Sequence, residues 1–426
     1  MTSTTPVPLA AVRGRTTRVL VGSQVLGGVG IATGFAVGAL LAEDISGSAT
    51  LSGLAQTAGV LGGALAAVPL ARLSIARGRR WGLGAGYAVA SVGAVVVAVG
   101  AAASSLSVLL VGMALFGVGQ ASGLQARYAA TDVAEPARRS RALATVVWAT
   151  TVGAVLGPSL ADPAGGTARA LGLPSLAGPF LWSLVSFGLA ALTIQMFLRP
   201  DPLLLAREWA SRDEDDPPAA DSGPRRDGTA QVIAAIRASP NAVLALVALV
   251  AAHAVMIGVM SMTPVHLGHG GVTLRVIGLV FSVHILGMYA FSPVVGWLAD
   301  RVGRVPVLLV GCGVLVVSLH VAGHTAGHES QQVGVGLFLL GLGWSCCIVA
   351  GSTLLSESVG TEVRPAVQGA ADLVMGLGGA AAGGLAGVVV GTAGYDVLAV
   401  VSSVLTVPVI VLAARALPRS RRPSGV

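Results

Sequence analysis

Residues 364–390 read RPAVQGAADLVMGLGGAAAGGLAGVVV, an apolar segment that starts at an arginine and contains a single carboxylate. An earlier segment, residues 138–158, repeats this plan, because it also starts at an arginine and carries a Gly-x-x-x-Gly pair at the same distance from it. A mostly apolar chain whose second half echoes its first predicts a membrane protein built from two related helix bundles. The paired glycines are Gly153 and Gly157, and Gly379 and Gly383.

The composition predicts that lipid surrounds most of the chain. Hydrophobic residues make up 54% of it and charged residues only 11%, whereas soluble proteins carry about 25% charged residues. A helix needs about 20 apolar residues to cross the hydrocarbon, and a backbone in hydrocarbon must satisfy its own hydrogen bonds. The predicted fold class is therefore an all-α membrane protein, with 12 transmembrane helices in two pseudo-symmetric six-helix bundles. The predicted spans are residues 19–42, 48–70, 81–103, 106–130, 142–161, 176–198, 241–263, 273–298, 305–323, 333–355, 367–390 and 394–416.

A long polar segment divides the chain. We expect an N-terminal bundle over residues 1–198, a cytoplasmic linker over 199–240 and a C-terminal bundle with a short basic tail over 241–426. The linker contains RDEDDPPAADSGPRRDG, which predicts a flexible tether, and residues 232–239 are typical of a short amphipathic helix on a membrane surface. The basic residues gather in alternate loops, so the positive-inside tendency predicts that both termini are cytoplasmic. We expect a bacterial cytoplasmic (inner) membrane.

Several function classes are excluded by composition. The net charge of +7 sits in short loops between apolar runs, which does not suit a nucleic-acid binder. The three cysteines lie in apolar runs without metal-ligand spacing, so no metal or other cofactor is expected. The chain contains no lysine and no enzymatic motif, which argues against ATP hydrolysis and against an enzyme. The expected partners are a small-molecule substrate, protons and the lipid bilayer, and we expect a monomer.

The loop after the eighth predicted span carries a specific motif, GWLADRVGR, at residues 296–304. Glycines allow the tight turn of a short loop, and an aspartate can cap a neighbouring helix or pair with arginines. The motif resembles the G-x-x-x-D-R-x-G-R loop signature of the major facilitator superfamily. The resemblance implies a latch that holds one state of a cytoplasmic gate. Its residues here are Gly296, Asp300, Arg301, Gly303 and Arg304.

The matching loop of the first half keeps only part of this signature. It reads RGRR at residues 77–80, and Ile75 stands where the family has aspartate. We therefore expect either Asp132 or Glu135, just after the fourth span, to supply the missing acid. The further gate candidates are Gly78, Arg79, Asp132 and, in the second half, Glu357.

The fifth span contains GAVLGP, formed by Gly153, Gly157 and Pro158 with their neighbours. Small residues at this spacing let two helices approach closely, and proline removes a backbone hydrogen bond. The segment resembles the G-x-x-x-G-P motif of antiporters in the same superfamily, although the glycine pair that usually follows is replaced by Ser159-Leu160-Ala161. The resemblance implies two bundles around a central cavity, alternating access, and membership of the drug:proton antiporters.

Ionisable groups inside spans are the candidates for proton coupling, since charge in hydrocarbon is costly and histidine titrates near neutral pH. The candidates are Asp372, His253 and His284. For Asp372 the alternative is a helix-end residue that pairs with Arg364. For each histidine the alternative is a hydrogen-bonded core residue.

Polar and aromatic residues inside other spans are candidates for lining the cavity. They are Gln24, Gln120, Arg127 and Tyr289. Arg127 is expected to pair with Asp132 or with a carboxylate across the bundle, or else to reach the inner interface. The predicted function is proton-coupled efflux of small amphiphilic or drug-like molecules. The alternatives are a proton-coupled importer of a small nutrient or chelate, and a membrane sensor that transports nothing.

Overall fold

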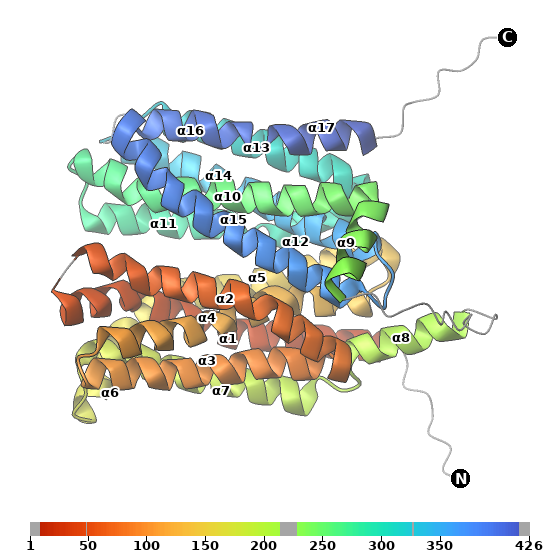
Figure 1. The fold of residues 1–426 in the computed structure, drawn as a ribbon, viewed down its shortest axis with the longest axis horizontal. Coiled ribbons are helices and arrows are strands. Elements are labelled where there is room, and N and C mark those ends of the chain that lie inside the picture. Colours follow the sequence, from red (N-terminus) through yellow and green to blue (C-terminus); the bar gives the residue numbers. More distant parts are fainter. Residues whose placement is uncertain (1–8, 48, 214–227, 326–327, 417–426) are drawn as a thin grey trace.

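The computed structural model describes residues 9–47, 49–213, 228–325 and 328–416, and almost all of these residues are helical, with no strand among them. Two groups of roughly parallel helices lie side by side (Figure 1). The 12 predicted spans are confirmed, because the described residues contain 12 helical segments of sufficient length and hydropathy to cross a membrane. Many outward-facing side chains are large and apolar, as lipid contact requires.

The first half places α1 against α5 and α7, and α4 against α2 and α3. Its long helices are α1 (Leu9–Ser46), α2 (Ala49–Arg77), α3 (Arg79–Ala102), α4 (Leu106–Asp132), α5 (Arg139–Ser159) and α7 (Gly178–Phe197). The short α6 (Ala161–Ala170) and the 3-10 turns η1 (Pro136–Arg138) and η2 (Ser175–Ala177) connect them.

The second half places α14 against α10, α11 and α13, and α10 against α15. Two of its spans are broken where a proline enters a first turn, Pro293 in the eighth span and Pro408 in the last. The helices are α10 (Pro240–His269), α11 (Leu274–Tyr289), α12 (Ser292–Val302), α13 (Arg304–Gly323), α14 (Ser330–Glu357), α15 (Arg364–Ala393), α16 (Tyr395–Val404) and α17 (Val407–Ala416).

The linker is more ordered than the sequence predicts. The flexible tether is wrong for α8 (Pro202–Asp213), which is held because Arg207 Nη1 donates to the carbonyl oxygen of Ile75 at 3.0 Å. The helix predicted over residues 232–239 is confirmed as α9 (Gly228–Ala238), and its apolar side packs against the core of the second half. The most charged part of the predicted tether, residues 214–227, lies outside the described residues.

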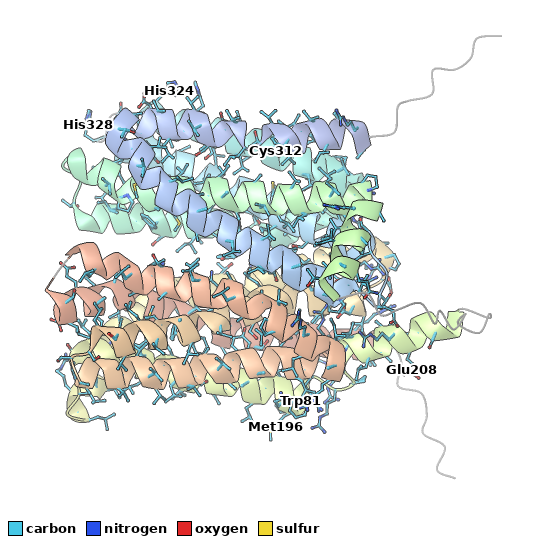
Figure 2. The ribbon with its side chains drawn as sticks, in the orientation of Figure 1. Trp81, Met196, Glu208, Cys312, His324 and His328 are labelled. Carbon is cyan, nitrogen blue, oxygen red and sulfur yellow. The ribbon has the colours of Figure 1, made fainter. Side chains whose placement is uncertain are left out.

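The two halves meet along α2 and α15 on one side and along α5, α11 and α12 on the other. Both α8 and α9 lie at one end of the molecule (Figure 1), which we call the linker end. The opposite end, where His324 and His328 lie (Figure 2), we call the far end.

Candidate functional site

The linker end is closed by a carboxylate of the second half that caps a helix of the first. The backbone N–H groups of Ser140 and Arg141, in the first turn of α5, each donate to the Asp300 carboxylate at 3.0 Å. The first turn of a helix offers free N–H groups and a positive dipole end, both of which favour an anion. The contact crosses between the halves, so it stabilises the arrangement in which their linker ends touch.

A second set of contacts lies beside this cap. Arg304 Nη2 lies 3.4 Å from Asp300 Oδ1 and donates to Glu357 Oε1 at 2.9 Å and to the carbonyl oxygen of Pro136 at 3.1 Å. Glu357 also lies 3.9 Å from Arg139 Nη1 of the first half. In contrast, the Arg301 guanidinium lies over the Trp297 ring of its own helix.

The first half builds its side of the closure without the family aspartate. Arg79 Nε donates to Asp132 Oδ2 at 2.8 Å, and Arg79 Nη2 donates to Gln368 Oε1 of the second half at 2.5 Å. Asp132 thus supplies the acid, as one of the two alternatives predicted, while Glu135 pairs with Arg13. Both Arg79 and Asp132 are fully buried, so the ion pair is shielded from water.

The glycines of the two loops adopt matching conformations. Gly78 has φ +97° and Gly303 has φ +98°, which a residue with a side chain rarely adopts. Each stands directly before the first turn of a helix, α3 or α13. The first turn of α3 is capped by the carboxylate of Asp201, a residue that follows the sixth span. This carboxylate accepts from the backbone N–H groups of Arg79 and Arg80 at 3.1 and 2.8 Å.

An ion pair joins the halves further inside the molecule. Arg127 Nη2 on α4 donates to Asp372 Oδ1 on α15 at 2.7 Å, and both side chains are 2% exposed or less. Arg127 Nε also donates to Ser352 Oγ on α14 at 3.1 Å. The predicted carboxylate across the bundle is thus found, and the alternatives in which Arg127 pairs with Asp132 or Asp372 pairs with Arg364 are wrong.

A central cavity of about 320 Å³ lies next to this ion pair, with walls from both halves. All four predicted cavity residues line it, and so does His253. The wall from the first half carries amides and hydroxyls. The wall from the second half is mainly apolar, with methionines, isoleucines and aromatic rings.

A side chamber of about 30 Å³ adjoins the cavity and contains Asp372 in its wall. Its walls come from α2, α4, α10 and α15, and it shares Gln120 and His253 with the central cavity. This volume suits about two water molecules. Asp372 Oδ2 has no hydrogen-bond partner among the described residues. Asp372 therefore faces this small chamber rather than the main cavity.

The two candidate histidines have different surroundings. The indole N–H of Trp344 donates to His253 Nδ1 at 3.3 Å, so in this arrangement Nδ1 carries no proton and the ring is neutral. His284 is fully buried between α11 and α14, where Nδ1 contacts the carbonyl oxygen of Leu337 at 2.7 Å. His284 lines neither space, as the alternative of a core histidine predicts.

The glycines of the span-5 motif lie against α1. A Cβ atom on Gly153 would collide with the backbone of Gly28, and one on Gly157 would collide with Ala32. The close approach predicted from the Gly-x-x-x-Gly spacing is therefore present within the first half. The α5 helix ends at Ser159, directly after Pro158, whose side chain lies outside the described set.

Several site residues were missed from the sequence. Gln368 precedes Asp372 by one helical turn, and Arg364 precedes Gln368 by another, so the three lie along one face of α15. Polar residues at this spacing in an apolar span could have identified these site residues from the sequence. Tyr87 and Thr150, which hold Gln24 at 3.0 and 3.3 Å in the cavity wall, gave no such signal in the sequence.

The arrangement defines a class: 12 membrane-spanning helices in two halves that meet around a central cavity. The sequence model of the Major Facilitator Superfamily matches residues 19–272 and 266–426. The chain belongs to the major facilitator superfamily and is a secondary transporter.

Relatives and solved structures agree with this assignment. The chain is 35% identical over 400 residues to the uncharacterized MFS-type transporter YddS of Bacillus subtilis (strain 168), covering 93% of this chain and 90% of the relative. It is 28% identical to the riboflavin transporter RfnT of Brucella anthropi, covering 84% of each. The crystal structure of FucP in the outward conformation matches its fold with a TM-score of 0.67 at 15% identity, covering 95% of this chain and 99% of FucP.

Proposed function

We propose that this chain is a proton-coupled transporter of small amphiphilic molecules that works by alternating access. The observation that carries the proposal is the buried Arg127–Asp372 ion pair, which joins the halves beside the central cavity. Separating the linker ends must pull α4 and α15 apart, and an unpaired carboxylate in this place is costly. Protonation of Asp372 removes its charge and so lowers the cost of separation.

Efflux is the first candidate direction. It is supported by the antiporter-like motif in α5, whose glycines pack closely on α1. Uptake is the second candidate, because the charged residue in the wall of the central cavity is an arginine and not an acid. The riboflavin transporter among the relatives adds a planar, polar-edged molecule to the substrates worth testing.

The proposal can be tested in proteoliposomes with imposed pH gradients of both signs. A pH gradient should drive substrate across the wild-type membrane, and added substrate should dissipate the gradient. Asp372→Asn should abolish the response to the pH gradient while leaving exchange of labelled for unlabelled substrate. The control is Asp396→Asn, which alters an exposed acid of α16.

Unchanged gradient-driven transport in Asp372→Asn would remove Asp372 from proton coupling. In whole cells, an exporter lowers the internal substrate concentration and an uncoupler reverses the effect. Accumulation that an uncoupler abolishes would instead select uptake.

A further inference from the structure

The Arg127 guanidinium has unused hydrogen-bonding capacity inside the protein. Its Nε and Nη2 atoms donate to Ser352, to the Tyr128 hydroxyl at 3.1 Å and to Asp372. Its Nη1 atom is buried and has no hydrogen-bond partner within the described part of the chain. A buried donor without an acceptor destabilises the protein, because it has lost its hydrogen bond to water. Because Arg127 lines the central cavity, a molecule in the cavity lies next to this residue.

The charged groups around this site leave one ion pair beside the cavity. His253 is neutral because its Nδ1 accepts from Trp344, and the charge of Arg79 on α3 is matched by Asp132. From α14 and α2 the cavity receives Trp344, Ile348, Gln56 and Val60, which do not titrate. One cation and one anion remain beside the cavity, Arg127 and Asp372. The titratable groups that face them are Tyr128 on α4, His253 on α10 and Tyr289 on α11.

We infer that the central cavity binds amphiphilic organic monoanions, and that each anion is bound together with one proton on Asp372. When Asp372 is protonated, Arg127 keeps its charge and loses its neutralising partner. An anion in the central cavity beside Arg127 restores neutrality, which a buried arginine requires. A cation in the central cavity would instead add a second positive charge, because Asp372 lines the side chamber and not the central cavity.

The apolar lining of the cavity indicates which kind of uncharged group the anion carries. The second half offers Met256, Met260 and Met288 with the rings of Tyr289 and Trp344, surfaces that suit a flat apolar group. The Tyr289 and Trp344 rings meet edge to face, with centroids 5.8 Å apart. An aromatic monocarboxylate combines such a body with one negative charge.

Binding of the anion together with a proton has a consequence for the direction of transport. If a proton strengthens binding of the anion, the anion strengthens binding of the proton by the same factor. An inward proton gradient would then drive uptake, whereas an antiporter requires that substrate and proton compete. The inference rests on the proposed proton coupling at Arg127 and Asp372 but not on efflux, and it favours the second candidate direction.

The test uses the purified full-length chain in detergent and three probes of one shape: 2-naphthoate, the neutral 2-naphthamide and the cationic 2-naphthylmethylammonium. Calorimetry at pH 6 and pH 8 should show that naphthoate binds at least about tenfold more tightly than the other two at pH 6. Its dissociation constant should fall by up to about tenfold per unit decrease in pH. Buffers of different ionisation heat should report uptake of about one proton per bound anion.

Variants assign the charges. Asp372→Asn imitates the protonated acid, so it should keep naphthoate binding at pH 8 and lose its pH dependence. The double variant Arg127→Gln/Asp372→Asn leaves no unpaired buried charge; it should lose the preference for naphthoate over naphthamide. His253→Gln should retain the pH dependence. Melting temperatures of all variants check that they are folded.

Three results would overturn the inference. They are tighter binding of the cation, proton release on naphthoate binding, and absence of naphthoate binding at both pH values. Loss of pH dependence in His253→Gln but not in Asp372→Asn would likewise place the proton elsewhere. Gradient-driven transport of the cation in proteoliposomes would refute the inference and leave the proposed function standing. Absence of any pH-driven transport would refute the proposed function itself.

Discussion

Single side chains hold the linker end closed, and the contact made by Asp300 is the one that a substitution tests most directly. Its carboxylate accepts from two backbone N–H groups of the other half while its side chain stays 3% exposed. Loss of a helix cap typically costs about 1 kcal/mol, which corresponds to roughly a fivefold change in an equilibrium. A residue far from the cavity can thus bias the balance between the two states of the transporter.

We expect Asp300→Ala to raise the open fraction of the linker end about fivefold. A reporter cysteine at Leu143, which is buried at the seam between the halves, should react about fivefold faster with a small maleimide. The background replaces Cys312, Cys346 and Cys347 by alanine. Arg301→Ala is the matched control, since its side chain lies over Trp297 in the same helix. Equal rates in the two variants would show that the cap does not stabilise closure.

At the scale of elements, close helix contacts depend on glycines whose neighbours the structure identifies. Gly153 on α5 lies against the backbone of Gly28 on α1, whereas Gly188 on α7 has no atom within 4 Å of the place where a Cβ would stand. The same substitution therefore has opposite effects at the two positions.

We expect Gly153→Ala to destabilise the protein by about 1–3 kcal/mol, because α1 and α5 must move apart. Gly188→Ala should be neutral or stabilising by up to about 1 kcal/mol, because alanine favours helix. Thermal unfolding in detergent measures both. Coinciding melting curves would mean that the α1–α5 contact yields without cost.

The elements also show how much of the structure can be predicted from the sequence. Hydropathy predicts the 12 spans, because a helix in contact with lipid carries apolar side chains on every turn. The Arg127–Asp372 pair was open between alternatives, since its partners come from opposite halves and only the packing of α4 on α15 selects one. The α8 helix was missed because its anchors, Asp201 and Arg207, contact α3 and Ile75, which lie far away in the sequence.

At the scale of the whole molecule, the hydrogen bonds and ion pairs that join the halves within the described residues lie from the linker end inward to Arg127 and Asp372. The described structure is therefore closed at the linker end. If that end is cytoplasmic, as the arginines predict, this is an outward-facing state.

Labelling of intact cells tests the orientation. In the cysteine-free background, His324→Cys at the far end should react with a membrane-impermeant maleimide, and Glu208→Cys at the linker end should react only after permeabilisation (Figure 2). Both positions are exposed, so access to the reagent and not burial decides the outcome. The reverse pattern would invert the topology and make the described state inward-facing.

The segment that joins the halves is fastened at both ends, by Asp201 on the first turn of α3 and by Ser239 on the first turn of α10. Because the Asp201 carboxylate accepts from the first turn of α3, the start of the connecting segment is fixed to the first half. The segment therefore leaves that half from the same point whichever way the two halves tilt.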